Sequence, residues 1–453
     1  MRAVIVVLIM VSLGVVSIGC PRTPRTPREA AWAALSGRPT QEPGAPDALA
    51  RFLRRLTTLA SAPEGTRLRV AHFGDSHIAA DLWTGRLRTV LQERFGDGGR
   101  GFLLFGKPWA GYWPEGAETG ATEGWEGSNA LLVGVEGVET TGVFGLGGGA
   151  LCTVEVGPEA WITLSDPDGT DLGEVVFVTG PGGGTLELIV GDQAPRSIPT
   201  LADAPALGVQ AWRMDGAGPR TLRVRSAGGG RVCVLGATME RPGTGIVYDA
   251  LGLNGARLTH LTRWDPWVEP MLARRRYQLL VFSYGTNEAI DEWLDLPTYE
   301  RAAGKALQRL RTLTPDADCL LLGPPPSGTP GSEPPRLQER LVALVGIQKA
   351  LARRHGCAYF DTLAWTGGPV VFPDWIEDPA AVLVQLDERL DLATARSLRR
   401  RPEPTGLYQP DRIHLTVEGY RLLGDLVADA LLRAWAAYLR GAAMDALRTL
   451  LGR

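Results

Sequence analysis

The spacing of apolar positions predicts alternating strands and helices at both ends of the chain. An apolar run at residues 67–73 predicts a strand, and helical spacing precedes it at 47–60 and follows it at 77–95. The rhythm resumes from about residue 246, with predicted strands at 277–283, 319–323 and 357–361 and predicted helices at 297–313, 335–354 and 416–439. Such alternation predicts a parallel sheet covered by helices on both faces.

The middle of the chain has a different pattern. Helical spacing disappears after about residue 105, glycines accumulate, and short apolar runs follow one another at 130–135, 151–156, 161–164, 174–178, 185–190, 221–225 and 231–235. Many short strands at this spacing are typical of a β-sandwich. We therefore expect one α/β domain, formed by residues 47–105 and 246–453, with an inserted β-sandwich at 106–245. The glycine-rich segment 145–150 resembles a dinucleotide fingerprint, but it leads into a strand and is interpreted as a hairpin turn.

The N-terminus has the pattern of a secretion signal. Arg2 precedes an apolar run at residues 3–16, which is short for a membrane span, and small residues follow. Cysteine directly after Ser17-Ile18-Gly19 resembles the lipobox of bacterial lipoproteins. That resemblance implies removal of residues 1–19, lipid on Cys20, and a protein anchored in the cell envelope that faces the periplasm or the cell surface. An ordinary signal peptide or a short anchor is the alternative. Residues 20–46 are rich in proline and predict a tether.

The composition limits the classes of partner that the protein can have and bears on whether its cysteines are oxidised. The 453 residues include 44% hydrophobic residues, enough for a sizeable core, and the net charge of -3 argues against a nucleic-acid partner. Besides Cys20 the chain has an even number of cysteines: Cys152, Cys233, Cys319 and Cys357. Two disulfides or buried free thiols are both compatible with this number, and the sequence alone does not give the pairing.

Polar residues at strand ends suggest acyl-transfer chemistry. Ser76 follows the first strand and can act as a nucleophile if a base reaches it. Asp411 and His414 precede the last helix, three residues apart, so that the carboxylate can orient the imidazole as that base. The backbone amides of Ser76 and Gly255 and the side chain of Asn287 can form an oxyanion hole. Each residue alone also fits a cap or a turn, and the argument therefore depends on their joint order.

That order resembles the SGNH (GDSL) hydrolase superfamily, whose four blocks contribute Ser, Gly, Asn and His. Here the blocks are Gly74-Asp75-Ser76, Gly255, Gly285-x-Asn287 and Asp411-x-x-His414, although Gly252 lies only three residues before Gly255. The resemblance implies a three-layer, flavodoxin-like α/β fold. Two positions depart from the commoner motif, with His77 in place of Leu and Glu288 where Asp is frequent.

These motifs look most like the peptidoglycan O-acetylesterase branch, which carries a β-sandwich between its first two blocks. The resemblance implies a serine esterase that removes O-acetyl groups from muramic acid O6 through an acetyl-enzyme on Ser76. It also implies an acetylated glycan as substrate and a carbohydrate-binding role for the insert. Trp109, Trp113 and Trp125 could stack on sugar rings, although indoles in a sandwich are more often core residues.

Two other functions fit the same residues. The serine could pass acetyl to a sugar hydroxyl, which would make the protein an O-acetyltransferase. Alternatively, it could be a lipid-anchored glycan-binding protein in which the sandwich does the work. None of these functions calls for a cofactor, and no metal is expected because the histidines lack the spacing of metal ligands.

Overall fold

The computed structural model describes residues 46–133, 142–165, 171–215, 220–262, 267–328, 334–368 and 406–450. The predicted signal, Cys20 and most of the predicted tether lie outside these residues, as do residues 369–405. Among the helices in the described ranges, none is long and apolar enough to cross a membrane.

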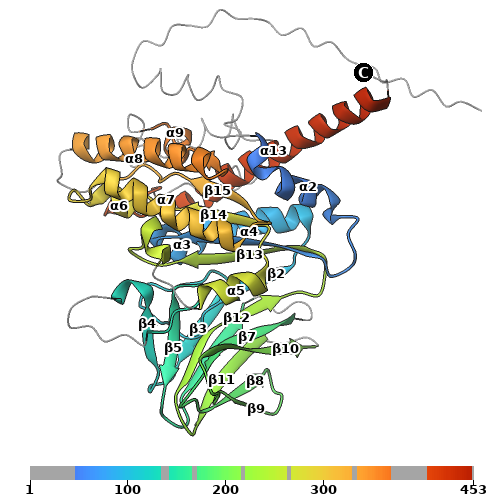
Figure 1. Cartoon of the computed structure of the whole chain (residues 1–453), viewed down its shortest axis with the longest axis vertical. Coiled ribbons are helices and arrows are strands. Elements are labelled where there is room, and N and C mark those ends of the chain that lie inside the picture. Colours follow the sequence, from blue (N-terminus) through green and yellow to red (C-terminus); the bar gives the residue numbers. More distant parts are fainter. Residues whose placement is uncertain are drawn as a thin grey trace, which may run out of the picture.

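The described part of the chain contains a parallel sheet of five strands in the order β13-β1-β14-β15-β16 (Figure 1). The strands are β1 (Arg67–Gly74), β13 (Gly245–Gly252), β14 (Leu279–Ser283), β15 (Asp318–Leu322) and β16 (Ala358–Phe360). Gly74, the last residue of β1, is opposite both Gly252 and Ser283, the last residues of its two neighbours. The segments that follow these three strands therefore emerge together at the carboxyl edge of the sheet, where open α/β sheets bind their ligands.

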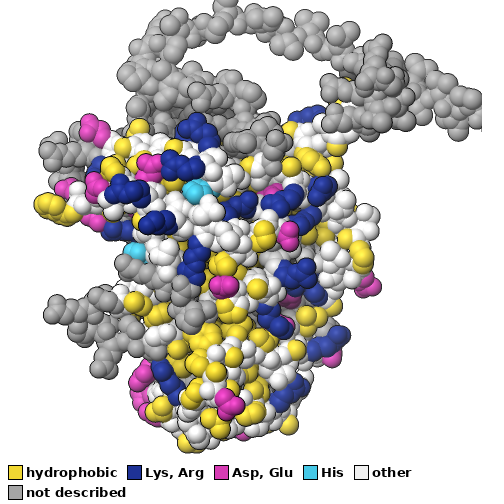
Figure 2. All heavy atoms as spheres, in the orientation of Figure 1, with side chains coloured by type: hydrophobic (Ala, Val, Ile, Leu, Met, Phe, Trp, Pro, Cys, Tyr) yellow, Lys and Arg dark blue, Asp and Glu magenta, His cyan; other side chains and the backbone are white. Residues whose placement is uncertain are grey.

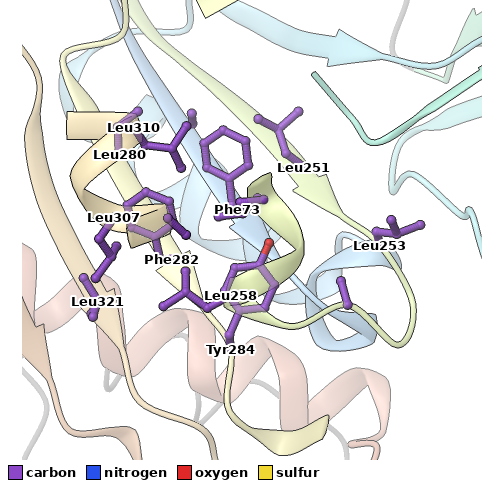
Figure 3. Close-up of a cluster of buried hydrophobic side chains, with 14 of the residues drawn as sticks. Phe73, Leu251, Leu253, Leu258, Leu280, Phe282, Tyr284, Leu307, Leu310 and Leu321 are labelled. Carbon is purple, nitrogen blue, oxygen red and sulfur yellow. The ribbon is translucent and has the colours of Figure 1, made fainter. Parts of the chain in front are cut away.

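Helices cover both faces of this sheet. On one face β1, β14 and β15 pack against α2 (Ala50–Leu59), α4 (Leu82–Phe95) and α13 (Val417–Leu450). The other face packs against α5 (Val268–Arg275), α7 (Leu296–Leu313) and α8 (Pro334–Arg354). Figure 3 shows part of this second core, in which the rings of Phe73 and Phe282 stack with centroids 5.6 Å apart. The predicted three-layer α/β fold is confirmed.

The middle of the chain folds into two antiparallel sheets below the α/β unit in Figure 1. One contains β10-β7-β12-β5-β4, with β2 on β12, and the other contains β3-β6-β11-β8-β9. Apolar side chains from both sheets share one core, which includes Leu151, Phe177, Ile162 and Leu222. The strands are β2 (Gly99–Leu103), β3 (Ala117–Ala121), β4 (Glu126–Asn129), β5 (Gly149–Thr153), β6 (Glu159–Leu164), β7 (Asp171–Thr179), β8 (Thr185–Val190), β9 (Arg196–Pro199), β10 (Ala206–Met214), β11 (Arg220–Gly228) and β12 (Val232–Glu240).

A buried ion cluster fastens this insert to the α/β unit. Arg275 of α5 contacts Asp249 of β13 at 2.7 Å and Glu240 of β12 at 2.5 Å, and all three side chains are at least nine-tenths buried. Asp249 also accepts the backbone N–H of Phe102 in β2. Because a buried charge is costly unless it is paired, these contacts fix how the two units meet. On the face seen in Figure 2, hydrophobic side chains gather over the middle of the insert.

Several local predictions need correction. The helix expected at residues 77–95 is broken into α3 (Ser76–Ala79) and α4, because Asp81 between them is left-handed with φ 56°. The run that begins at Ala130 is a short 3-10 turn, η2 (Ala130–Leu132), in place of a strand. β2 pairs with β12, so residues 99–103 belong to the antiparallel sheets although the expected boundary was residue 105.

The cysteines form two disulfides, which the sequence left open. Cys152 of β5 and Cys233 of β12 are directly opposite in the register and are bonded. Cys319 of β15 is bonded to Cys357, which directly precedes β16. Each bond therefore links neighbouring strands within one sheet.

Candidate active site

Ser76 lies at a sharp corner between β1 and α3. The corner needs glycine at position 74, because a Cβ there would lie 2.2 Å from Cγ1 of Ile78. Asp75 caps the turn by accepting the backbone N–H of His77 at 2.9 Å. The caps and the close packing leave the Ser76 side chain half-buried at the carboxyl edge of the sheet.

The structure brings Ser76, His414 and Asp411 together in one chain of hydrogen bonds. Nε2 of His414 is 2.9 Å from Oγ of Ser76, and Nδ1 is 2.7 Å from Oδ2 of Asp411. The other carboxylate oxygen of Asp411 accepts the backbone N–H groups of Ile413 and His414, each at 2.9 Å. Burial opposes ionisation of Asp411, but the hydrogen bonds from His414 and from these amides lower its pKa below the usual value. An ionised Asp411 holds His414 in the tautomer that can accept a proton from Ser76.

Gly255 lies in the loop after β13, which we call the glycine loop (residues 253–258). Gly255 is exposed and left-handed, with φ +78°, so its conformation favours glycine. Gly252 has a different role, because a Cβ there would lie 2.2 Å from the backbone nitrogen of Ala79 and would push α3 away from β13. The geometry therefore favours Gly255 over Gly252 as the glycine that faces an incoming ligand.

Four hydrogen bonds hold the glycine loop, one from the end of β1, two from α6 (Thr286–Ile290) and one from the insert. The backbone N–H of Leu253 bonds to the carbonyl of Gly74 at 3.0 Å, and Nδ2 of Asn287 bonds to the carbonyl of Ala256 at 3.0 Å. The N–H of Leu258 donates to Oε1 of Glu288 at 3.1 Å. From the insert, Nε1 of Trp109 donates to Oδ1 of Asn254 at 2.9 Å. The insert thus contacts the same loop that carries Gly255.

Two buried carboxyl groups lie beside Asn287. Burial raises the pKa of Asp75 to about 8, opposed by the amide of His77 and reinforced by the nearby Glu288. Burial likewise raises the pKa of Glu288 to about 7. Nδ2 of Asn287 is 3.4 Å from Oδ2 of Asp75, a long hydrogen bond. Oε2 of Glu288 is buried and has no hydrogen-bond partner among the described residues. A protonated carboxyl group at one or both positions avoids two adjacent buried charges.

The two histidines near the corner are buried structural residues. His77 is bonded to the hydroxyls of Tyr420 and Thr286, and its ring centre is 5.6 Å from that of His414. Burial first, and then the neighbouring His414, lower the pKa of His77 to about 3, so it remains neutral. His72 is bonded to Tyr248 and Ser283. In the described ranges, no three or more His, Cys, Asp and Glu side chains are grouped to hold a metal ion.

Part of the chain matches a known protein family. Residues 214–422 match the GDSL-like Lipase/Acylhydrolase family. The chain carries a GDSL/SGNH acylhydrolase domain. The match to this domain includes Gly255, Asn287, Asp411 and His414, whereas Ser76 lies before it. The eleven described antiparallel strands, β2 to β12, all lie between Ser76 and the other three blocks, and the match begins at the last residue of β10, within the insert.

A solved structure of a peptidoglycan O-acetylesterase shares the fold of most of the chain. The two are 23% identical, with a TM-score of 0.66, and the similarity covers 88% of this chain and 99% of that one. A lipase/acylhydrolase from Enterococcus faecalis matches 41% of this chain and 74% of its own at 18% identity and a TM-score of 0.27. A family two carbohydrate esterase from Cellvibrio japonicus matches 47% and 80% at 13% identity and a TM-score of 0.22. Curated proteins gave no significant match.

The sequence did not predict two residues that hold the acylhydrolase site. In the sequence Glu288 stands out only as a departure from the commoner motif, and nothing local indicates its contact with the glycine loop. The sequence suggests only sugar stacking for Trp109. Its position in the insert gave no indication that its indole reaches Asn254. Of the other two tryptophans, Trp113 is 58% exposed and Trp125 packs against the core of the insert.

Proposed function

We propose that this protein is a serine esterase that removes O-acetyl groups from a cell-wall glycan, with the muramic acid of peptidoglycan as the acetylated sugar. The observation that carries the proposal is the chain of hydrogen bonds from Asp411 through His414 to Ser76, directed at a corner beside the glycine loop. The shared fold with a peptidoglycan O-acetylesterase supports the choice of substrate.

In the first half of the reaction, Oγ of Ser76 attacks the acetyl carbonyl carbon while Nε2 of His414 takes the serine proton. The carbonyl oxygen becomes an oxyanion. The backbone N–H groups of Ser76 and Gly255 and the side-chain amide of Asn287 stabilise that charge. The long hydrogen bond from Asn287 to Asp75 is the one that the oxyanion can replace at little cost, because it is already weak.

The protonated His414 then gives its proton to the sugar oxygen. The bond between the acetyl carbonyl carbon and this oxygen breaks, and acetyl remains on Ser76. A water molecule then attacks the carbonyl carbon of this acetyl-enzyme, while His414 accepts a proton from the water. The second tetrahedral intermediate collapses, acetate leaves, and Ser76 regains its proton. A glycan hydroxyl in place of water would give acetyl transfer, which is the alternative function.

The same proposal includes the location of the protein and the role of the insert. We infer that lipid on Cys20 anchors the chain in the cell envelope, through a proline-rich tether, and that the insert binds glycan. The two disulfides support an oxidising compartment, where such bonds persist.

The test is acetate release from O-acetylated peptidoglycan, with p-nitrophenyl acetate as a small substrate. We expect Ser76→Ala and His414→Ala to lower kcat by about 10⁴-fold or more, and Asp411→Asn to lower it by the same amount or less. Ser61→Ala, an exposed serine elsewhere, is the control and retains the parental rate. Parental activity in Ser76→Ala would refute the mechanism. Acetylated glycan formed from p-nitrophenyl acetate would identify a transferase, and wall binding without esterase activity in the parental protein would identify a binding protein.

A further inference from the structure

A cavity lies between the α/β unit and the insert. It has a volume of about 470 Å³ and is lined by α4, by Asp97 and β2, by the β2–β3 connection, by the last residue of β6, by the residue after β12 and by the start of α13. None of Ser76, Gly255, Asn287, Asp411 and His414 lines it. Its volume falls in the range of small-molecule sites, about 300–1,000 Å³. It is therefore large enough for a sugar ring and distinct from the catalytic centre.

Arginine dominates the charged lining of this cavity, which we call the arginine cavity. Five arginines line it, against two acidic residues: Arg86, Arg88, Arg100, Arg241 and Arg421, with Asp97 and Glu115. Arg86 contacts Asp425, Arg241 contacts Asp97, and Arg421 contacts Glu115. These three guanidinium groups are therefore paired with three different carboxylates.

The remaining two arginines share one carboxylate. Arg88 and Arg100 both contact Asp81, and no other carboxylate in the described residues is in contact with either of them. Arg100 is nine-tenths buried, and its Nη1 has no hydrogen-bond partner among the described residues. Burial and the nearby charge of Arg88 lower the pKa of Arg100 to about 10, against the attraction of Asp81 and, more weakly, of Tyr112 and Glu115. The wall of the cavity thus holds one positive charge more than its partner carboxylate neutralises, which favours an anion in the cavity.

The charge and the other lining groups indicate the kind of anion. A single uncompensated charge is matched by a monoanion such as a carboxylate, whereas a phosphate dianion would bring an excess of negative charge. Guanidinium groups pair well with carboxylates. Thr89 and Gln92 add neutral polar groups to the lining, of the kind that contact sugar hydroxyls.

We propose that the arginine cavity is a second binding site, which takes a sugar that carries a carboxylate. The anion part of this proposal does not depend on the esterase reaction. The choice of a sugar acid rests on the proposed function, because the substrate is then an acidic glycan and the cavity would hold one of its units away from Ser76.

Gly116 offers a matched pair of variants. It lines the cavity, and a Cβ on it would have no atom within 4 Å, so a side chain there has room. Its φ of +74° is left-handed, a conformation that Asn and Asp tolerate better than other residues. Gly116→Asp places a carboxylate at the cavity, and Gly116→Asn places a neutral side chain of the same shape. Arg421→Gln is a second variant at an exposed position.

Binding to the full chain is measured by calorimetry with three probes: N-acetylmuramic acid, N-acetylglucosamine, which lacks the carboxylate, and inorganic phosphate. We expect N-acetylmuramic acid to bind at least 10-fold more tightly than the other two probes. Gly116→Asp is expected to weaken that binding about 10-fold or more and Arg421→Gln about 3-fold or more, whereas Gly116→Asn stays within about 2-fold of the parental protein.

Three results would overturn the proposal: equal binding of the two sugars, binding of phosphate alone, or the same affinity in Gly116→Asp and Gly116→Asn. The result is separable from the fate of the proposed function. Ser76→Ala is expected to bind N-acetylmuramic acid as the parental protein does, so that a failed esterase assay would leave the binding result standing.

Discussion

The two halves of the candidate site are built in opposite ways. The proton-accepting half, Asp411 and His414, is a single short turn whose hydrogen bonds are almost all local, and the two side chains are 43% and 35% exposed. The oxyanion half, around the glycine loop and Asn287, is assembled from β1, β13, α6 (Thr286–Ile290) and the insert. Its carboxyl groups, Asp75 and Glu288, are buried.

The geometry of the proton-accepting half thus depends on local contacts, whereas the geometry of the oxyanion half depends on contacts between segments far apart in the chain. Removal of a side chain in the first half affects the proton transfer directly. A change in the second half can act at a distance, because four segments must meet for Gly255 to keep its place. The insert therefore contacts the oxyanion half through Trp109. Among the described residues, none of the hydrogen bonds that link Asp411, His414 and Ser76 involves the insert.

The largest effect in the oxyanion half is expected at Asn287. Asn287→Ala removes both the side-chain donor that we propose for the oxyanion and the bond to the carbonyl of Ala256. We expect kcat on p-nitrophenyl acetate to fall by about 10²–10³-fold, which is the cost of losing one oxyanion donor. Steady-state kinetics and the unfolding midpoint are measured together. A loss below about 3-fold in a folded variant would remove Asn287 from the oxyanion hole.

A smaller effect is expected at Trp109. Trp109→Phe keeps a ring beside Tyr112 but removes the N–H that bonds to Asn254. We expect kcat on p-nitrophenyl acetate to fall about 3- to 10-fold with little change in KM, because a small ester does not reach the insert but does need a correctly placed Gly255. Trp435→Phe is the matched control, since it removes an indole bond to Thr57 at the far side of α13. If only KM for the glycan changes, Trp109 contacts substrate and does not position the loop.

The smallest effect on activity is expected at Glu288. Its substitution is expected to change how the free energy of unfolding depends on pH. Glu288→Gln keeps an oxygen for the N–H of Leu258 but cannot ionise. In the folded parental protein the pKa of Glu288 is about 7, against 4.5 for an unfolded chain, so the folded state binds more protons between these values. Its contribution to stability is therefore full below pH 4.5 and is lost as the pH rises through 7.

Urea unfolding at pH 4.5, 6 and 7.5 measures this contribution. As the pH rises from 4.5 to 7.5, the free energy of unfolding of the parental protein is expected to decrease. We expect the decrease in Glu288→Gln to be smaller by about 1–3 kcal/mol. Identical pH dependence in the two proteins would mean that the pKa of Glu288 is the same in the folded and the unfolded state, which contradicts the value of about 7.

The sequence predicted most of the α/β unit because its signals are local. Apolar runs such as residues 277–283 correspond to buried strands such as β14, and the order of Ser76, Gly255, Asn287, Asp411 and His414 was visible without a structure. The pattern predicts no separate range for the edge strand β13, although it predicts that the α/β alternation resumes at about residue 246, where this strand begins. The break at Asp81 was also missed, since the apolar spacing continues across it and a left-handed residue leaves no periodic signal.

The sequence by itself determined the fold class of the outer parts, the all-β character of the middle and the residue types needed for serine chemistry. Hydrophobic periodicity and motif order depend only on neighbours along the chain. The tertiary structure alone decided the disulfide pairs, the different surroundings of Gly252 and Gly255, the contact of Trp109 with the glycine loop and the shared carboxylate in the arginine cavity. These depend on contacts between residues far apart in sequence, such as Trp109 and Asn254, which no local pattern specifies.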